Sequence, residues 1–257
     1  MILRDFHVHS TYCDGKSTLE ETVLAAIEKG IRHLGFSGHS YTPFDEGYCM
    51  SPSDTKRYVA EIKTLKEKYK DKIKIYCGIE KDVFSDIDTS EFDYAIGSAH
   101  YILADGCYIP VDLNAQTLLK GANEHFGGDI YSLAEAYYET VSLLADKEFD
   151  IIGHFDLITK FNRNGAMFDE SNPRYVKAVY SALEKLVPLG KTFEINTGVI
   201  VRGYKDTPYP ADFIIKAINE MGGSFILNSD SHRSDMLCFE FEKWFSHASA
   251  LNVKWYK

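Results

Sequence analysis

The sequence lacks any long hydrophobic run, and none of its apolar stretches approaches the roughly 18 residues that a membrane-spanning helix needs. The first residues, Met1 to His7, lack the basic, apolar and small-residue sections of a secretory signal peptide. No linker rich in proline, glycine or serine, no low-complexity segment and no internal repeat interrupts the chain. We therefore expect a cytoplasmic protein without a membrane partner, folded as a single domain over residues 1–257.

Cysteine is scarce, and no two cysteines are spaced as Cys-x-x-Cys. The five cysteines are odd in number and widely separated: Cys13, Cys49, Cys77, Cys107 and Cys238. This usage argues against a disulfide framework and against a thiolate zinc site, so we expect free thiols.

Positive charge is also in short supply, because 28 Lys and Arg face 38 Asp and Glu, for a net charge of −10. Such a balance opposes binding to nucleic acid and favours a small substrate. The oligomeric state leaves no sign in the sequence.

Hydrophobic residues, in contrast, make up 45% of the chain, which is enough for a large core. Short apolar runs typical of strands alternate with segments of helical periodicity, which indicates an α/β fold with a parallel sheet covered by helices. We predict seven strands, over residues 2–8, 34–38, 73–79, 94–99, 149–153, 192–196 and 224–228.

Capping patterns predict where some of the helices begin and end. Ser17 with Glu20 predicts the start of the first helix, and Ser132 with Glu135 predicts the start of a helix before the fifth strand. Further helices are predicted at residues 58–69, 172–189 and 211–221. Residues 101–131 fit least well, because glycines including Gly121 interrupt the periodicity. We interpret this segment as an excursion over the mouth of the site; the alternative is a surface insertion without a role.

Nearly every predicted strand ends in a histidine or a carboxylate. His7 and His9 are two residues apart, so in a strand both imidazoles point the same way, and Asp14 follows in the next turn. Each histidine alone could equally be an ordinary hydrogen-bonded side chain, the role we assign to His33, His125 and His247. The joint placement of the others predicts a metal site, because the C-terminal ends of parallel barrel strands share one face. The strand-end residues are His7, His9, His39, Glu80, His100, His154, Asp230 and His232.

The motifs resemble those of a known family. The chain carries the following motifs in order: His-x-His with a following acid, Gly-His-Ser, Gly-Ile-Glu, Gly-Ser-x-His, Gly-His-Phe-Asp and Ser-Asp-Ser-His. The chain thereby resembles the polymerase and histidinol phosphatase (PHP) superfamily, whose motifs occur in the same order. Within that superfamily it is most similar to the histidinol-phosphate phosphatases. The resemblance implies a distorted (β/α)7 TIM-like barrel with three divalent metal ions. It also implies hydrolysis of L-histidinol phosphate to L-histidinol and inorganic phosphate in histidine biosynthesis.

The resemblance also implies a role for each motif residue. The first ion would take His7, His9, Glu80 and Asp230; the second would share Glu80 and add His100 and His154; the third would take Asp14, His39 and His232. Arg202 matches an arginine that binds phosphate, so the expected catalytic residues are Arg202, Glu80, Asp230 and His232. Two positions depart from the pattern, since relatives can place a histidine at Asp14 and often have Asp where Gly38 stands here. Imidazole and carboxylate ligands suit Zn, Mn or Fe, and the sequence does not choose among these metals.

Charge supports a phosphomonoester as the substrate. Three divalent ions and three carboxylates leave a net charge of +3, which attracts a phosphate dianion. We predict attack on phosphorus by a metal-bridging hydroxide, because metals can lower the pKa of bound water to about 7. Lys160, Arg163 and Arg233 are further candidates for attracting phosphate, although we expect them on a solvated face. Asp156 could orient His154 or meet the amine of the substrate, and we expect it to give structural support. Three aromatic residues near the predicted ligands are candidates for stacking on a substrate ring or for core packing: Tyr101, Phe155 and Tyr204.

Other functions fit part of the pattern. A PHP-type enzyme could act on another small phosphomonoester, a nucleotide or a phosphodiester, and a metal-dependent amidohydrolase uses a similar ligand set for acyl transfer. A third alternative is a metal-binding module without catalytic activity. We disfavour this last alternative, because every predicted ligand position carries a residue able to bind a metal.

Overall fold

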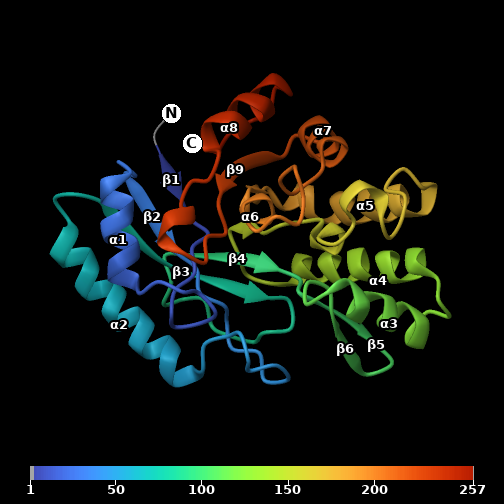
Figure 1. The fold of residues 1–257 in the computed structure, drawn as a ribbon, viewed down its shortest axis with the longest axis horizontal. Coiled ribbons are helices and arrows are strands. Elements are labelled where there is room, and N and C mark those ends of the chain that lie inside the picture. Colours follow the sequence, from blue (N-terminus) through green and yellow to red (C-terminus); the bar gives the residue numbers. More distant parts are fainter. Residues whose placement is uncertain (1–2, 257) are drawn as a thin grey trace.

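The computed structural model describes residues 3–256. Seven parallel strands form the centre of the molecule, as predicted for a barrel (Figure 1). The expected start of the first strand at Ile2 lies outside the described residues. The sheet order follows the chain order, and every neighbouring pair is parallel. The strands are β1 (Arg4–Asp5), β2 (His33–Phe36), β3 (Lys74–Asp82), β4 (Tyr94–Ser98), β7 (Ile151–Ile152), β8 (Thr192–Asn196) and β9 (Ser224–Asn228).

Backbone hydrogen bonds just beyond β1 and β9 join the two edges of the sheet. The His9 N–H donates to the Ser231 carbonyl at 2.8 Å, and the Ser231 N–H donates to the His7 carbonyl at 3.0 Å. The barrel is therefore closed where the first and last site motifs meet, although these motifs are more than 200 residues apart in the sequence.

Helices cover the outside of the barrel, with α1 and α2 on one side and α3, α4 and α5 on the other (Figure 1). They are α1 (Leu19–Glu28), α2 (Pro52–Tyr69), α3 (Ala115–His125), α4 (Ile130–Ser142), α5 (Pro173–Leu186), α6 (Gly198–Val201), α7 (Asp212–Glu220) and α8 (Phe241–Ala250). Short 3-10 helices occur at Leu143–Asp146, Leu157–Thr159, Arg163–Gly165, Val187–Leu189 and Ser234–Met236. Within residues 3–256, no helix combines the length and the apolar character that crossing a membrane requires.

Both predicted capping pairs are wrong. The capping box of α1 is formed by Thr18 and Glu21, one residue later than predicted, because the Ser17 hydroxyl instead accepts the Ser234 N–H at 3.1 Å. At α4 the N-cap is Asp129, whose carboxylate accepts the N–H groups of the first turn. Ser132 lies in the first turn of that helix, where its hydroxyl donates to Asp129 at 2.9 Å. The competitor at Ser17 is tertiary and is not encoded by a local pattern, whereas Asp129 is a local N-cap three residues before Ser132.

The segment 101–131 is ordered secondary structure rather than a loop. A hairpin of β5 (Tyr101–Ala104) and β6 (Cys107–Pro110) turns at Asp105 and Gly106, both with positive φ, and is followed by α3. Gly121 does not interrupt α3: its missing side chain lets the helix approach the hairpin, since a Cβ there would lie 2.6 Å from Ile109 Cγ2. The excursion is thus built from two packed elements.

The interior of the barrel holds a small apolar layer below the strand ends. Ile96 on β4 and Ile226 on β9 pack together with Phe6 and Tyr94, although two strands separate β4 from β9 in the sheet. The Tyr94 hydroxyl crosses the interior and donates to the carbonyls of Phe6 at 2.5 Å and Phe36 at 3.0 Å. This layer closes the barrel beneath the polar residues at the C-terminal ends.

Replacing Gly78 on β3 with alanine is expected to destabilise this layer, because the new Cβ would overlap the Tyr94 ring. Overpacking of a core typically costs about 1–3 kcal/mol, which thermal unfolding measures as a lower melting temperature. The matched control is Gly47→Ala, where the nearest atom to the new Cβ is Asp45 Oδ1 at 3.4 Å. Equal melting temperatures for the two variants would show that the Tyr94 ring is free to move aside.

Candidate metal centre

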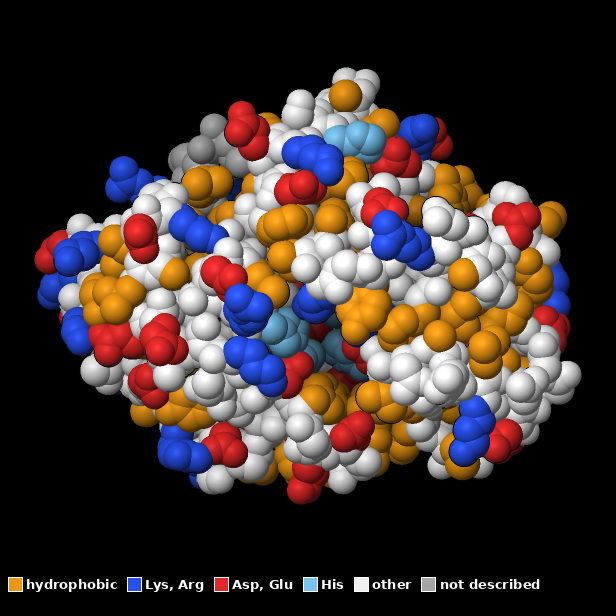
Figure 2. All heavy atoms as spheres, in the orientation of Figure 1, with side chains coloured by type: hydrophobic (Ala, Val, Ile, Leu, Met, Phe, Trp, Pro, Cys, Tyr) orange, Lys and Arg blue, Asp and Glu red, His pale blue; other side chains and the backbone are white. Residues whose placement is uncertain are grey.

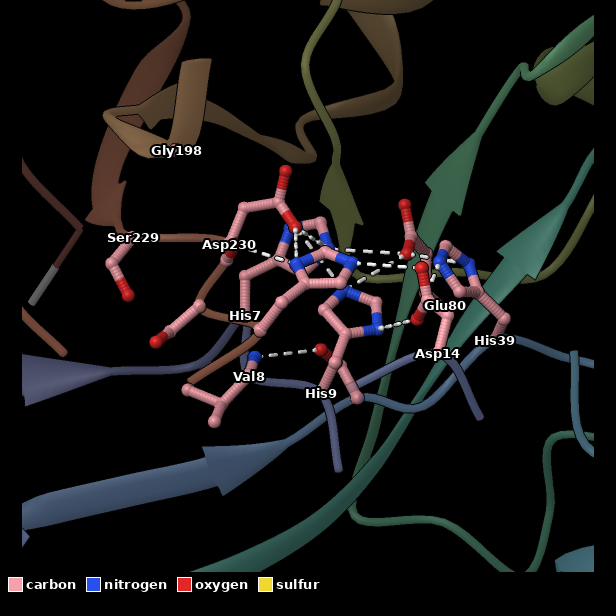
Figure 3. Close-up of polar contacts among 12 residues, drawn as sticks. His7, Val8, His9, Asp14, His39, Glu80, Gly198, Ser229 and Asp230 are labelled. Carbon is pink, nitrogen blue, oxygen red and sulfur yellow. Dashed lines mark hydrogen bonds and ion pairs between the residues drawn. The ribbon is translucent and has the colours of Figure 1, made fainter. Parts of the chain in front are cut away.

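The side chains that follow the strand ends meet in one buried cluster. Each belongs to a group of three or four ligand atoms that lie within 4.8 Å of one another. The imidazoles and carboxylates point toward a common centre in the close-up view (Figure 3). All nine predicted ligands are brought together: His7, His9, Asp14, His39, Glu80, His100, His154, Asp230 and His232.

Glu80, a fully buried carboxylate near the C-terminal end of β3, lies at the middle of the cluster. Its Oε1 is 2.9 Å from His154 Nε2 and 3.3 Å from His100 Nε2. Its Oε2 is 3.1 Å from His7 Nε2 and 3.0 Å from His39 Nδ1. The two oxygens therefore face imidazoles from opposite sides, as a carboxylate that bridges two ions must.

His9 lies between two groups of residues. Its Nε2 is 3.2 Å from Asp230 Oδ1, and its Nδ1 is 3.7 Å from Asp14 Oδ1. Its ring also stacks on that of His232, with the ring centroids 4.1 Å apart. Val8, between His7 and His9 in the sequence, is buried, so the extended chain directs both histidines into the site.

Asp230 reaches the site from an unusual backbone conformation. Its φ is 49°, in the left-handed region that non-glycine residues adopt only when other contacts hold them there. Arg202 supplies such contacts, because its Nη1 donates to the Asp230 carbonyl at 3.0 Å and its Nη2 donates to Oδ2 at 2.8 Å. The same guanidinium thus positions the carboxylate and leaves Oδ1 facing the histidines.

The cluster keeps its carboxylates ionised. Burial opposes the ionisation of Glu80, but the imidazoles of His7, His39 and His100 outweigh it and hold the pKa of Glu80 well below its usual range. Burial likewise opposes ionisation of Asp230, and Arg202 and His7 hold its pKa well below normal. Ionised carboxylates are the form that binds cations.

His9 is held in the neutral form. Burial lowers the pKa of His9 to about 3, and the neighbouring imidazoles of His232 and His39 act in the same direction. A neutral imidazole keeps a lone pair on one ring nitrogen, which a metal ligand requires.

The donor set fits bound cations. Four buried polar atoms make no hydrogen bond although each lies next to others of the cluster: His7 Nε2, His9 Nε2, Asp14 Oδ1 and Glu80 Oε2. Buried polar atoms without a partner are costly, and cations placed among these nitrogen and oxygen atoms would satisfy them. Nitrogen and oxygen donors without thiolate suit Zn, Mn or Fe. The residues present are thus suited to hold divalent ions.

A cavity of about 500 Å³ opens over the cluster. In the space-filling view its floor carries histidine side chains, with lysine or arginine atoms beside it (Figure 2). Arg202, which follows α6, lines this cavity together with seven of the nine predicted ligands. A larger hollow of about 670 Å³ lies at the opposite end of the strands, around Arg4 and Tyr76, and contains none of the predicted ligands.

The excursion at residues 101–131 contributes the wall of the cavity, as predicted. Tyr101, Pro110, Asp112 and Leu113 all line it. The expectation for Lys160 is wrong: its side chain is only 13% exposed and lines the same cavity. The reason is its pairing with the excursion, since Lys160 Nζ donates to the Asp112 carbonyl at 2.8 Å and to its carboxylate at 3.2 Å.

Arg163 and Arg233 are exposed, as expected, and pair with surface carboxylates. Asp156 is buried and accepts the Ala211 N–H at 3.0 Å, which agrees with structural support. Burial raises the pKa of Asp156 to about 6. The remaining histidines also agree with their ordinary roles: His33, His125 and His247 bond to Tyr76, Asp105 and Asp212, respectively.

The predicted aromatic residues divide into two groups. Phe155 is 1% exposed and packs against Tyr138 and Phe193, so it belongs to the core. Tyr101 and Tyr204 line the cavity, where their rings can contact a bound molecule.

Two supporting carboxylates were not among the predicted site residues. Asp82 accepts from His100 Nδ1 at 3.0 Å, and Glu194 accepts from His7 Nδ1 at 2.7 Å. Each fixes the orientation of a predicted ligand, as carboxylates behind metal-binding histidines commonly do. Both could be found from the sequence, because Asp82 follows Glu80 at the same-face spacing and Glu194 lies in the middle of an apolar strand.

A parallel barrel with a buried imidazole and carboxylate cluster at the C-terminal ends of its strands defines a metal-binding α/β barrel of the hydrolase type. The chain belongs to the PHP domain family, whose model matches residues 5–198. This match confirms the resemblance predicted from the motifs.

Known proteins similar to this chain cover most of its length. A probable histidinol-phosphatase of Schizosaccharomyces pombe is 30% identical over 250 residues, which span 88% of this chain and 79% of that protein. A structure from Listeria monocytogenes is 20% identical, with a TM-score of 0.79, and covers 94% of this chain and 99% of its own. The histidinol phosphate phosphatase of Lactococcus lactis, solved with zinc, L-histidinol and phosphate, is 21% identical with a TM-score of 0.73, and the match covers 99% of this chain and 95% of that one. The structural likeness confirms the barrel fold.

Proposed function

We propose that the protein is a metal-dependent phosphatase that hydrolyses L-histidinol phosphate to L-histidinol and inorganic phosphate, a reaction of histidine biosynthesis. The observation that carries the proposal is the convergence of nine potential ligands around Glu80 with Arg202 in the same cavity. The relatives described as histidinol-phosphatases support this substrate. The L-histidinol and phosphate bound to the Lactococcus lactis protein are the two products of the proposed reaction.

We assign the nine residues to three divalent ions in the arrangement that the motifs imply. His7, His9 and Asp230 form one group; His100 and His154 face the other side of Glu80; and Asp14, His39 and His232 form the third. His9 faces both the first and the third groups, through Asp230 at 3.2 Å and Asp14 at 3.7 Å. When bound, such ions polarise phosphoryl oxygens and lower the pKa of water to about 7.

The protein's own residues bind and orient the phosphate ester. Arg202 presents a half-buried guanidinium beside the cluster, and a planar guanidinium suits two hydrogen bonds to a phosphate. Lys160 adds a second positive charge at the cavity wall. The apolar layer of Ile96 and Ile226 closes the barrel further down, so a phosphate enters from the C-terminal face. Tyr101 and Tyr204 offer aromatic faces to the imidazole of the substrate.

A substrate panel tests the proposal against the alternatives. The purified, metal-loaded protein is assayed with L-histidinol phosphate, a nucleoside monophosphate, a phosphodiester and an N-acyl amide. We expect a kcat/KM for L-histidinol phosphate at least about 100-fold above the others, because a site shaped for specific polar groups rejects substrates that lack them. A preference for the nucleotide or diester would assign the chain to another PHP activity, and amide cleavage without phosphate release would indicate an amidohydrolase.

A further inference from the structure

Glu194 on β8 lies inside the barrel directly behind the candidate metal centre and is fully buried. Its two oxygens accept four hydrogen bonds, two each. Oε1 accepts from His7 Nδ1 at 2.7 Å and from Asn228 Nδ2 at 2.9 Å. Oε2 accepts from the His154 backbone N–H at 2.9 Å and from Asn196 Nδ2 at 2.8 Å. One carboxylate therefore joins segments that carry ligands of two predicted ion positions.

Three of the four donors to Glu194 cannot become hydrogen-bond acceptors. The His154 donor is a backbone N–H. The Asn196 side chain is held with its NH2 toward Glu194, because its Oδ1 accepts the Gly198 N–H at 2.9 Å. Asn228 is held in the same way, because its Oδ1 accepts the Phe6 N–H at 3.0 Å. Only an acceptor with two oxygens satisfies all of these groups at once.

His7 is the one partner that can exchange donor and acceptor, because a neutral imidazole exists as two tautomers. With its proton on Nδ1, directed at Glu194, the lone pair lies on Nε2. That atom makes no hydrogen bond in its buried position and faces Glu80 Oε2 at 3.1 Å and Asp230 Oδ1 at 3.7 Å. The free nitrogen of His7 thus points at the centre of the ligand cluster (Figure 3).

We propose that Glu194 is a positioning residue that fixes the Nδ1–H tautomer of His7, so that Nε2 is the nitrogen that binds metal. The inference rests on the proposed metal centre. Because the same carboxylate holds the His154 backbone, it also sets the distance between ligands on the two sides of Glu80.

Glu194→Gln is the informative variant, since glutamine replaces one acceptor oxygen with an NH2 group. At the Oε2 position this NH2 would meet the His154 N–H and the Asn196 NH2, both fixed donors. At the Oε1 position it would meet only one fixed donor, the Asn228 NH2, besides the adaptable His7 Nδ1. Glutamine therefore places its NH2 at the Oε1 position, toward His7. The His7 Nδ1 then becomes an acceptor, its proton moves to Nε2, and Nε2 no longer has a lone pair for a metal.

The test combines zinc content with ¹⁵N NMR of histidine-labelled, zinc-loaded protein. In the unsubstituted protein we expect His7 bound to zinc through Nε2 with its proton on Nδ1. In Glu194→Gln we expect zinc affinity about 10- to 100-fold weaker, at least one equivalent of zinc lost, and no zinc-bound Nε2 signal from His7. The matched control is Asp212→Asn, which makes the same change at the exposed Asp212–His247 pair and should leave zinc content unchanged.

Several outcomes overturn the inference. One is a His7 that binds zinc through Nδ1 in the unsubstituted protein, a measurement that does not depend on folding of the variant. Another is a Glu194→Gln protein with the full zinc content and an unchanged His7 signal. If the unsubstituted protein bound no zinc, manganese or iron, the proposed metal centre itself would fail, which is distinct from both results.

Discussion

Replacing Glu80 with glutamine is expected to reduce phosphate release from L-histidinol phosphate by at least about 1,000-fold. The Glu80 carboxylate faces four imidazoles from two sides, and glutamine has only one oxygen with which to replace its two. Loss of the proposed bridging ligand would remove metal stabilisation worth several kcal/mol, and each factor of ten in rate corresponds to about 1.4 kcal/mol. The measurement is kcat, with metal content determined on the same sample.

The matched control for this change is Glu148→Gln, at an exposed position just before the fifth barrel strand. Its activity and metal content should equal those of the unsubstituted protein. Thermal unfolding of Glu80→Gln shows whether the variant is folded. A folded Glu80→Gln protein with normal metal content and normal turnover would exclude Glu80 from the centre of the site.

Replacing Arg202 with alanine is expected to lower kcat/KM by about 100- to 1,000-fold, the usual cost of losing one charged or hydrogen-bonding group that stabilises a transition state. The guanidinium lines the cavity and also holds the Asp230 carboxylate at 2.8 Å. Arg202→Lys keeps the charge but not the planar pair of donors, so we expect an intermediate rate. Metal content separates the two roles: if Arg202 acts mainly on phosphate, Arg202→Ala retains its metal.

Arg163→Ala serves as the matched control, since Arg163 is an exposed arginine paired with Asp206 on the surface. Its kinetic constants should not change. Unchanged kcat/KM in Arg202→Ala would remove this arginine from the site and leave Lys160 as the cationic group of the cavity.

The barrel could be predicted from the sequence because two physical regularities agree. Apolar runs alternate with helical periodicity, and polar ligand residues follow the runs at Glu80, His100 and His154. In a parallel barrel those positions share one face, so a linear pattern translates directly into a three-dimensional cluster. The nine residues are close together for this reason, although Asp14 and His232 are distant in sequence.

Two features that the sequence did not predict depend on tertiary partners. Thr18 rather than Ser17 begins α1, because Ser234 bonds the Ser17 hydroxyl. Lys160 was expected in solvent, but Asp112 on the excursion draws it into the cavity. Such contacts join segments far apart in the chain, and neither periodicity nor spacing encodes them.

The residues that hold the metal ligands in place are a second group that the sequence reasoning did not identify. Glu194 does not line the cavity over the cluster and carries no motif of its own, yet it accepts hydrogen bonds from four groups in the barrel interior. Its position in the middle of an apolar strand is the only local sign of that role, since a buried carboxylate needs partners.

The most direct test of the account is release of inorganic phosphate from L-histidinol phosphate by chelator-stripped protein that is reloaded separately with Mn, Zn or Fe. The account predicts no turnover without metal, fast turnover with at least one of the three metals, and its loss in a His39→Ala control. No phosphate release with any metal, in protein that binds these metals stoichiometrically, would contradict the proposed substrate. Turnover that survives metal removal would contradict the metal centre itself.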